Sequence, residues 1–185
     1  MRGLFGGAFD PPHNGHVALA EAALEHFALE RLAALVVVDP GHRDVVLDFP
    51  IRFGLAELAF AGLPRTEVVS EEHRYTVDAV RDGRFGDAIF LVGADEFASF
   101  LSWKEPNGVL DEVRLGVATR PGFAPEALDP VLQGLERSDR VSFFDIPELP
   151  ISGTEIRARA ARGEPVDEFV PPSVAAQIDR LGLYR

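Results

Sequence analysis

The chain has 185 residues, of which 46% are hydrophobic and 26% charged, proportions that fit one ordinary globular domain around a single core. Its formal net charge of −12 excludes a general nucleic-acid binder, which needs a broad basic face. The absence of cysteine excludes disulfides, thiolate metal sites and thiol catalysis.

No apolar run approaches the roughly 20 residues of a membrane span. Only Met1 to Leu4 precede the apolar Phe5, so no signal peptide is expected. We therefore expect a cytoplasmic protein that contacts no membrane and no nucleic acid.

Apolar, β-prone runs alternate with helical patterns along the chain. The runs predict strands at residues 4–5, 34–38, 67–69, 89–92, 115–118 and 141–144. Apolar periodicity predicts helices at residues 17–27, 51–61, 77–82, 125–135, 155–162 and 173–181. This alternation is typical of an α/β fold with a doubly wound parallel sheet, whose ligand crevice lies at the carboxyl ends of the strands. We expect one domain over residues 1–185, in which the helices of residues 152–185 form a small cap on the sheet edge.

The first strand leads directly into a loop with an unusual set of side chains. Gly6 and Gly7 let backbone amides approach a ligand that a Cβ would exclude, and Asp10, His13 and His16 follow. His16 falls in the first turn of the predicted helix, where unpaired amides and the helix dipole favour an anion. The loop therefore predicts a phosphate-binding site.

Two other readings of this loop stay open. His13 and His16 could belong to a zinc site, completed by Asp10 with His42 or His73. The phosphate reading is favoured because the glycines, the prolines and the helix start explain the spacing without further ligands. Asp10 could equally serve to cap the turn, as Asp before Pro often does.

A second polar segment precedes the helix predicted near the carboxyl end. Ser152 and Glu155 fit a capping box, so the helix start would offer amides and the Ser152 and Thr154 hydroxyls to a phosphate. Arg157 lies one turn further on. An isolated arginine would be read as a solvated charge, but its position favours a role in binding phosphate.

The middle of the chain supplies candidates for the nucleoside parts of a ligand. Asp95 follows Gly93 at a predicted strand end, where ribose hydroxyls are usually bound. Trp103 lies between the polar Ser102 and Lys104, which indicates a partly exposed ring able to stack on a base or pyridine. Lys104 is the only lysine and no Walker glycine precedes it, which rules out the common P-loop.

The residues of the first loop resemble a known family. Gly6-Gly7-x-Phe9-Asp10-Pro11-x-His13-x-Gly15-His16 is similar to the H-x-G-H pattern of the nicotinate-mononucleotide adenylyltransferases. Residues 151–157 resemble the family's I-S-S-T-x-I-R element, with Gly153 in place of its second serine. Weaker likenesses follow the same order in residues 74–80, 91–95, 120–122 and 182–184 and at Trp103.

The resemblance implies a Rossmann-like nucleotidyltransferase that transfers the adenylyl group of ATP to nicotinate mononucleotide. It implies catalytic roles for His13, His16 and Arg157. ATP would contact Gly6, Gly7, Ala8, Phe9, His13, His16, Gly93, Asp95, Ser152, Thr154 and Arg157. The mononucleotide would contact Asp10, Arg43, Tyr75, Thr76 and Trp103. Mg²⁺ would be carried by ATP, with no metal ligand from the protein.

Residues 38–44 depart from the family's P-N-x-x-P-P-H-K loop, and His42-Arg43 is the candidate for its H-K pair. Three alternatives remain: an adenylyltransferase of the same superfamily acting on nicotinamide mononucleotide, phosphopantetheine or a flavin; a metal-dependent hydrolase with His and Asp ligands; and a non-catalytic nucleotide-binding protein.

Overall fold

The computed structural model describes residues 1–41, 45–120 and 125–185. Six strands form one sheet in the order β3-β2-β1-β4-β5-β6, and every neighbouring pair is parallel. The strands are β1 (Arg2–Gly7), β2 (Arg31–Val37), β3 (Thr66–Glu71), β4 (Ala88–Gly93), β5 (Arg114–Thr119) and β6 (Val141–Asp145). The predicted doubly wound parallel sheet and all six predicted strands are thereby confirmed.

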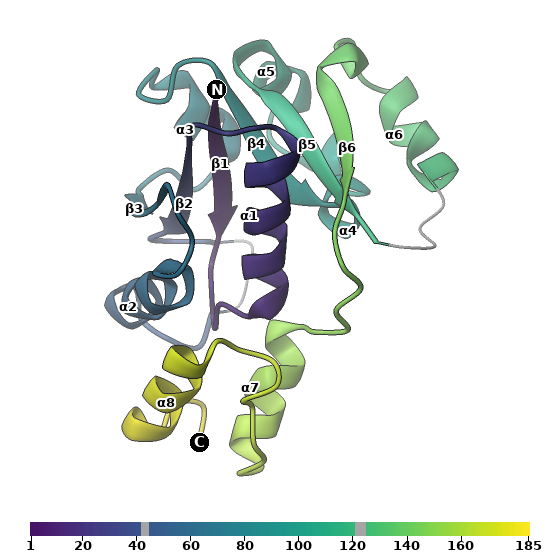
Figure 1. Ribbon diagram of the computed structural model, residues 1–185. Coiled ribbons are helices and arrows are strands. Elements are labelled where there is room, and N and C mark those ends of the chain that lie inside the picture. The colour runs from purple at the N-terminus through teal and green to yellow at the C-terminus, as the bar shows by residue number, and fades with distance from the viewer. Residues whose placement is uncertain (42–44, 121–124) are drawn as a thin grey trace.

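The strand order reverses between β1 and β4. The chain moves outward from β1 through β2 to β3, then crosses back to β4 and continues outward through β5 to β6 (Figure 1). Helices that follow β1 and β4 must therefore leave the sheet in opposite directions, which opens a crevice at the carboxyl ends of these two strands.

Helices cover both faces of the sheet. They are α1 (Asn14–His26), α2 (Phe49–Phe60), α3 (Thr76–Arg81), α4 (Ala94–Phe97), α5 (Pro106–Glu112), α6 (Asp129–Gln133), α7 (Gly153–Ala161) and α8 (Pro172–Leu181). Phe5 joins the core cluster that contains residues of α1, α2, α7 and α8, whereas the adjacent Leu4 joins the cluster of α3, α4, α5 and α6. Successive β1 side chains thus point into two separate cores, as the period of a strand requires.

Two features of the helices differ from the predictions. Residues 125–135 form a 3₁₀ turn (Pro125–Leu128) followed by the short α6, rather than one continuous helix. The pattern predicts neither α4 (four residues) nor α5 (seven residues), because neither segment shows a clear apolar helical period.

The carboxyl-terminal helices lie at the carboxyl ends of the strands, below β1 in Figure 1. The Ser173 hydroxyl donates to the Leu58 carbonyl of α2 at 3.1 Å, and the Asn14 amide at the start of α1 donates to the Phe169 carbonyl at 2.9 Å. The carboxyl-terminal segment therefore contacts α2 and the start of α1, at the carboxyl ends of the strands where the first loop emerges.

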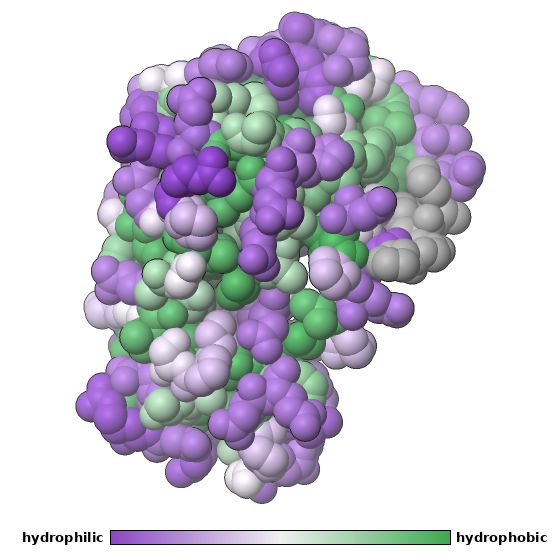
Figure 2. All heavy atoms as spheres, viewed as in Figure 1, coloured by the Kyte–Doolittle hydropathy of each residue, from purple (hydrophilic) through white to green (hydrophobic). Residues whose placement is uncertain are grey.

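In Figure 2 hydrophobic residues show mainly in the middle of this face, around α1 and α2. The upper end and the region of the carboxyl-terminal helices are largely hydrophilic in the same view. No helix in the described parts of the chain combines the length and the apolar character needed to cross a membrane.

Candidate active site

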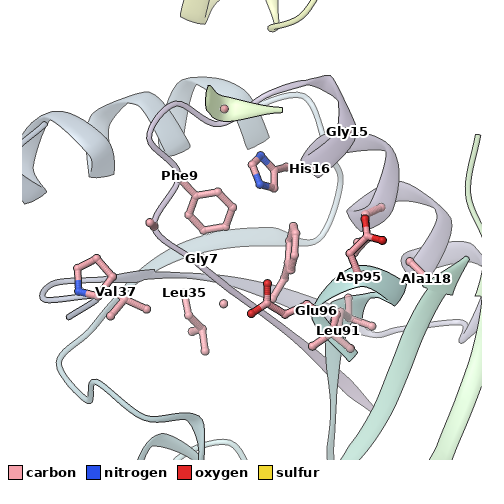
Figure 3. Close-up of a pocket in the computed structure, with 18 of the residues that line it drawn as sticks. Gly7, Phe9, Gly15, His16, Leu35, Val37, Leu91, Asp95, Glu96 and Ala118 are labelled. Atoms are coloured by element: carbon pink, nitrogen blue, oxygen red, sulfur yellow. The ribbon is translucent and has the colours of Figure 1, made fainter. Parts of the chain in front are cut away.

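The crevice at the strand ends holds a cavity of about 1170 Å³. Its wall combines the β1–α1 loop, the ends of β4 and β5, the start of α3 and the start of α7. In Figure 3 the His16 ring lies between Phe9 and the Asp95 carboxylate around this space. His13, His16 and Arg157, predicted from opposite ends of the chain, all line this one cavity.

The two histidines are ordered by the start of α1. His13 is the N-cap residue, and its backbone amide donates to Nδ1 of His16 at 3.1 Å. An amide can only donate, so Nδ1 of His16 must accept, and a neutral His16 carries its proton on Nε2. The loop thus fixes His16 as a hydrogen-bond donor through Nε2.

Electrostatics separates His13 from an ordinary surface histidine. Its burial, and secondarily the nearby Arg120 guanidinium, lower the pKa of His13 from 6.5 to about 4. His13 is therefore neutral near pH 7 in the free protein. A bound polyphosphate would raise the pKa of His13, because its negative charge favours the imidazolium.

Phe9 supports His16 rather than lining the site with an exposed ring. The Phe9 side chain is 2% exposed and meets the rings of Phe5, Phe60 and His16 edge to face at 5.6, 5.5 and 5.1 Å. A contact between Phe9 and ATP is therefore restricted to its backbone, while its ring holds the imidazole in place.

Arg157 reaches from α7 to the first loop. Its guanidinium donates to the Asp10 carbonyl at 2.7 Å and to the Thr154 hydroxyl at 3.2 Å. The helix start passes close to the loop: a Cβ on Gly153 would lie 3.4 Å from the Asp10 carbonyl oxygen and 3.3 Å from the Arg157 guanidinium. A glycine in place of the family's second serine fits this close approach.

The predicted capping box at α7 is half formed. The Ser152 hydroxyl accepts from the Glu155 amide at 3.2 Å. The Glu155 carboxylate pairs instead with Arg159 at 3.0 Å. The Ser152 hydroxyl proton is not used by this cap, so Ser152 can still donate to a ligand.

Asp10 has a structural role that the sequence left open. Its buried carboxylate accepts from the Tyr184 hydroxyl at 2.7 Å and from the Val46 amide. Both carboxylate oxygens are therefore bonded within the protein, which favours the structural role of Asp10 over direct contact with the mononucleotide.

Sequence reasoning missed Arg52, a fully buried arginine on α2 that is 1% exposed. Its guanidinium donates to the carbonyls of Ala8 (2.7 Å), Val37 (3.0 Å), Val38 (2.9 Å) and Leu47 (3.0 Å). Arg52 thus ties the first loop to the end of β2. In sequence it is one charge within an apolar helical pattern, and only that contrast could have drawn attention to it.

The ends of β4 and β5 contribute a carboxylate and a cation. Asp95 lies in the first turn of α4, after Gly93, and its side chain is 88% exposed. Its carboxylate lies 3.6 Å from the Arg120 guanidinium. Arg120, which was not among the predicted site residues, also lines the cavity.

Three of the predicted pyridine-binding residues, Tyr75, Thr76 and Trp103, line the same cavity. Tyr75 and Thr76 form the start of α3. The Lys104 ammonium lies 5.1 Å above the Tyr75 ring and is held by both Asp78 oxygens at 2.9 Å. Trp103 is partly buried against Phe100, with ring centroids 5.1 Å apart. Arg43, the fifth predicted mononucleotide ligand, lies outside the described residues, as does His42.

The described residues supply no ligand set for the zinc hypothesis. No three His, Cys, Asp or Glu side chains gather there in a way that could hold a metal ion. His73, one of the proposed extra ligands, has its Nδ1 2.8 Å from the Glu71 carboxylate, and Asp10 is bonded to Tyr184.

Comparison with known proteins gives a consistent set of relatives. The family model described as "Cytidylyltransferase-like" matches residues 4–159. A "Probable nicotinate-nucleotide adenylyltransferase" of Chromobacterium violaceum is 37% identical over 99% of this chain and 98% of its own length. A protein of the same name from Thermus thermophilus is also 37% identical, with the same coverage.

Two solved structures show the same fold. The nicotinic acid mononucleotide adenylyltransferase of Plasmodium falciparum complexed with NaAD has a TM-score of 0.79 at 16% identity, covering 99% of this chain and 96% of its own. A putative nicotinate-nucleotide adenylyltransferase of Vibrio parahaemolyticus has a TM-score of 0.67 at 22% identity, covering 100% and 94%.

Proposed function

The chain belongs to the cytidylyltransferase-like family and groups with its nicotinate-nucleotide adenylyltransferases, and we propose that it joins ATP to nicotinate mononucleotide. The products are nicotinate adenine dinucleotide and pyrophosphate, and the reaction is a step of NAD biosynthesis. The observation that carries this assignment is the common cavity of His13, His16 and Arg157. The named P. falciparum complex with NaAD supports the identity of the product.

The chemistry needs no nucleophile from the protein. The phosphate of a mononucleotide is largely dianionic near neutral pH, since its second pKa is about 6. One of its oxygens attacks the α-phosphorus of ATP, a P–O bond to that oxygen forms, and the bond to the β-phosphate oxygen breaks to release pyrophosphate. The enzyme must align the two substrates and neutralise charge on the α-phosphoryl oxygens and the departing pyrophosphate.

The described side chains fit these tasks. The Nε2–H of His16 and the imidazole of His13 donate to oxygens of the α- and β-phosphates, in the first turn of α1 where backbone amides also favour an anion. Arg157, with the amides and hydroxyls of Ser152 and Thr154, binds the triphosphate tail from the opposite side. Gly6, Gly7 and the Phe9 backbone let ATP approach the end of β1, and Asp95 binds a ribose hydroxyl beside Gly93.

The mononucleotide occupies the end of the cavity near α3. Tyr75 and Thr76 line the pyridine subsite and the Trp103 ring stacks on the pyridine. Arg43 is retained as a mononucleotide ligand on the sequence argument. We assign Asp10 to this substrate only through the loop that it holds, because its carboxylate is bonded to Tyr184 and Val46.

Mg²⁺ is proposed to enter with ATP. The cavity wall contributes imidazoles, a guanidinium and amides near the proposed triphosphate, and no metal-binding group of three ligands occurs among the described residues. This donor set fits a hydrated Mg²⁺ held by phosphate oxygens. Such an ion neutralises charge on the triphosphate and the leaving pyrophosphate. We propose the cytoplasm as the compartment.

The test is pyrophosphate release from ATP with a panel of acceptors: nicotinate mononucleotide, nicotinamide mononucleotide, flavin mononucleotide and phosphopantetheine. We expect the highest kcat/KM with nicotinate mononucleotide, and one dinucleotide formed per pyrophosphate by mass spectrometry. A higher kcat/KM with phosphopantetheine or the flavin would overturn the assignment. ATP hydrolysis without an acceptor product would support the hydrolase alternative.

A further inference from the structure

The last turn of the chain is bonded to the loop that carries the two histidines. The Tyr184 hydroxyl donates to the Asp10 carboxylate at 2.7 Å, across 174 residues of sequence. Burial and the bond to Asp10 raise the pKa of Tyr184 above its ordinary value. The phenol is therefore protonated at every pH at which the protein would work, and it acts as a permanent donor.

The backbone is in a sparsely populated conformation at Tyr184 and at the residue before Asp10. Phe9, directly before Asp10, has φ of 51°, and Tyr184 itself has φ of 66°. Aromatic residues rarely adopt the left-handed region, so such values persist only where surrounding contacts enforce them. The hydroxyl–carboxylate bond is one contact that joins the two strained positions.

Asp10 also accepts a hydrogen bond from Arg157 through its backbone carbonyl. The Arg157 guanidinium donates to the Asp10 carbonyl at 2.7 Å, while Arg52 holds the preceding Ala8 carbonyl. A shift of Asp10 would therefore displace Arg157 together with the loop that leads into His13. Asp10 thus connects Arg157 with the loop that carries His13, two parts of the proposed phosphate site.

From this geometry we infer that Tyr184 is a positioning residue for adenylyl transfer: its hydroxyl, through the Asp10 carboxylate, fixes the first loop and Arg157 around the triphosphate. The inference rests on the proposed function. Tyr184 touches no substrate. It acts by holding Asp10, and the carboxyl-terminal turn becomes part of the catalytic apparatus.

The direct test compares Tyr184→Phe with the wild-type enzyme in steady-state kinetics. The substitution removes one oxygen atom and keeps the ring that packs in the core. We expect kcat to fall by about 10-fold or more, as small displacements of aligned groups do, with both KM values within about 3-fold of wild type. Arg185→Gln is the matched control, since this exposed neighbour pairs with Asp179 at the surface, and it should keep the wild-type kcat.

A second variant separates positioning from substrate contact. Asp10→Ala should lower kcat without raising the KM for the mononucleotide. Tyr184→Phe added to it should cause no further loss, because the bond is already absent without the Asp10 carboxylate. A raised mononucleotide KM in Asp10→Ala would place the carboxylate on the substrate. Independent, additive losses would show that Tyr184 does not act through Asp10. Either result overturns the inference.

A purely structural role predicts a different pattern. Tyr184→Phe would then lower the melting temperature but keep the wild-type kcat at a temperature where circular dichroism shows both proteins folded, and this result also overturns the inference. Hydrogen exchange of the segment 13–17 gives a readout without turnover, and we expect faster exchange in Tyr184→Phe. If the wild-type enzyme forms no dinucleotide, the proposed function fails, and unchanged exchange would then reject the positioning role separately.

Discussion

The imidazole rings of His13 and His16 lie stacked, with centroids 3.7 Å apart and planes inclined by 24°. Two imidazolium ions at this separation would repel each other, and the lowered pKa of His13 keeps that ring neutral near pH 7. The stacked rings are a pair of donors that a triphosphate can polarise on binding. This relationship underlies the predictions for both residues.

His16→Ala should fold normally and lose about 100-fold in kcat, because it removes one positioned donor to the transferring phosphoryl group. The KM for ATP should change much less, since amides and Arg157 still bind the triphosphate. Steady-state kinetics at saturating mononucleotide measures this split. His26→Ala, at the other end of α1, is the control, and near-wild-type turnover in His16→Ala would remove His16 from catalysis.

Arg157→Lys should also lose about 100-fold in kcat/KM. Lysine keeps the charge but cannot reach the Asp10 carbonyl and the Thr154 hydroxyl with one rigid fork. The comparison is Arg162→Gln, which removes an exposed cation paired with Glu164 near the same helix and should have little effect. Equal losses in the two variants would indicate a general effect of charge rather than a role for Arg157.

His13 should make folding stability depend on pH. Its pKa is about 4 in the folded protein and 6.5 as a model value for the unfolded chain, so between these values the unfolded state binds more protons. The contribution of neutral His13 to the free energy of unfolding is complete above pH 6.5. It decreases as pH falls toward 4, and the total decrease is about 3 kcal/mol.

Urea denaturation of the wild type and His13→Asn across this pH range isolates that contribution, because carboxylates titrate in both proteins. The difference between their unfolding free energies should decrease as pH falls. A difference that is constant with pH would show that His13 keeps an ordinary pKa in the folded protein.

Activity should require Mg²⁺ and withstand a zinc-selective chelator. Treatment with EDTA should abolish turnover, and Mg²⁺ alone should restore it, because the ion is carried by the triphosphate. Elemental analysis of the purified protein provides the control. Stoichiometric zinc, together with inactivation by the selective chelator, would favour the metal-site reading of His13 and His16.

The sequence predicted the sheet well, because its strands are continuous apolar runs between helical patterns. It placed the start of α1 at Val17, three residues late, since the N-cap role of His13 depends on the His16 ring folding back onto its amide. The short α4 and α5 carry no readable period. Local patterns are therefore sufficient for the strands and for most helices, including the six-residue α3, and insufficient for α4 and α5.

Residues of the candidate site that form sequence motifs could be predicted, and residues that act at long range could not. His13, His16 and Arg157 follow recognisable spacings, and the structure brings them to one cavity. Arg52 gives no such signal, because its four carbonyl partners come from three separate segments. The pairing of Asp10 with Tyr184 likewise depends on the closed fold, so no sequence spacing encodes it.

The most direct test of the central claim is a crystal structure of the enzyme with Mg²⁺, a non-hydrolysable ATP analogue and nicotinate mononucleotide. We expect phosphate oxygens within hydrogen-bonding distance of His13, His16 and Arg157 in one complex, with the mononucleotide phosphate in line with the α-phosphorus. A triphosphate bound away from either the histidine pair or Arg157 would contradict it.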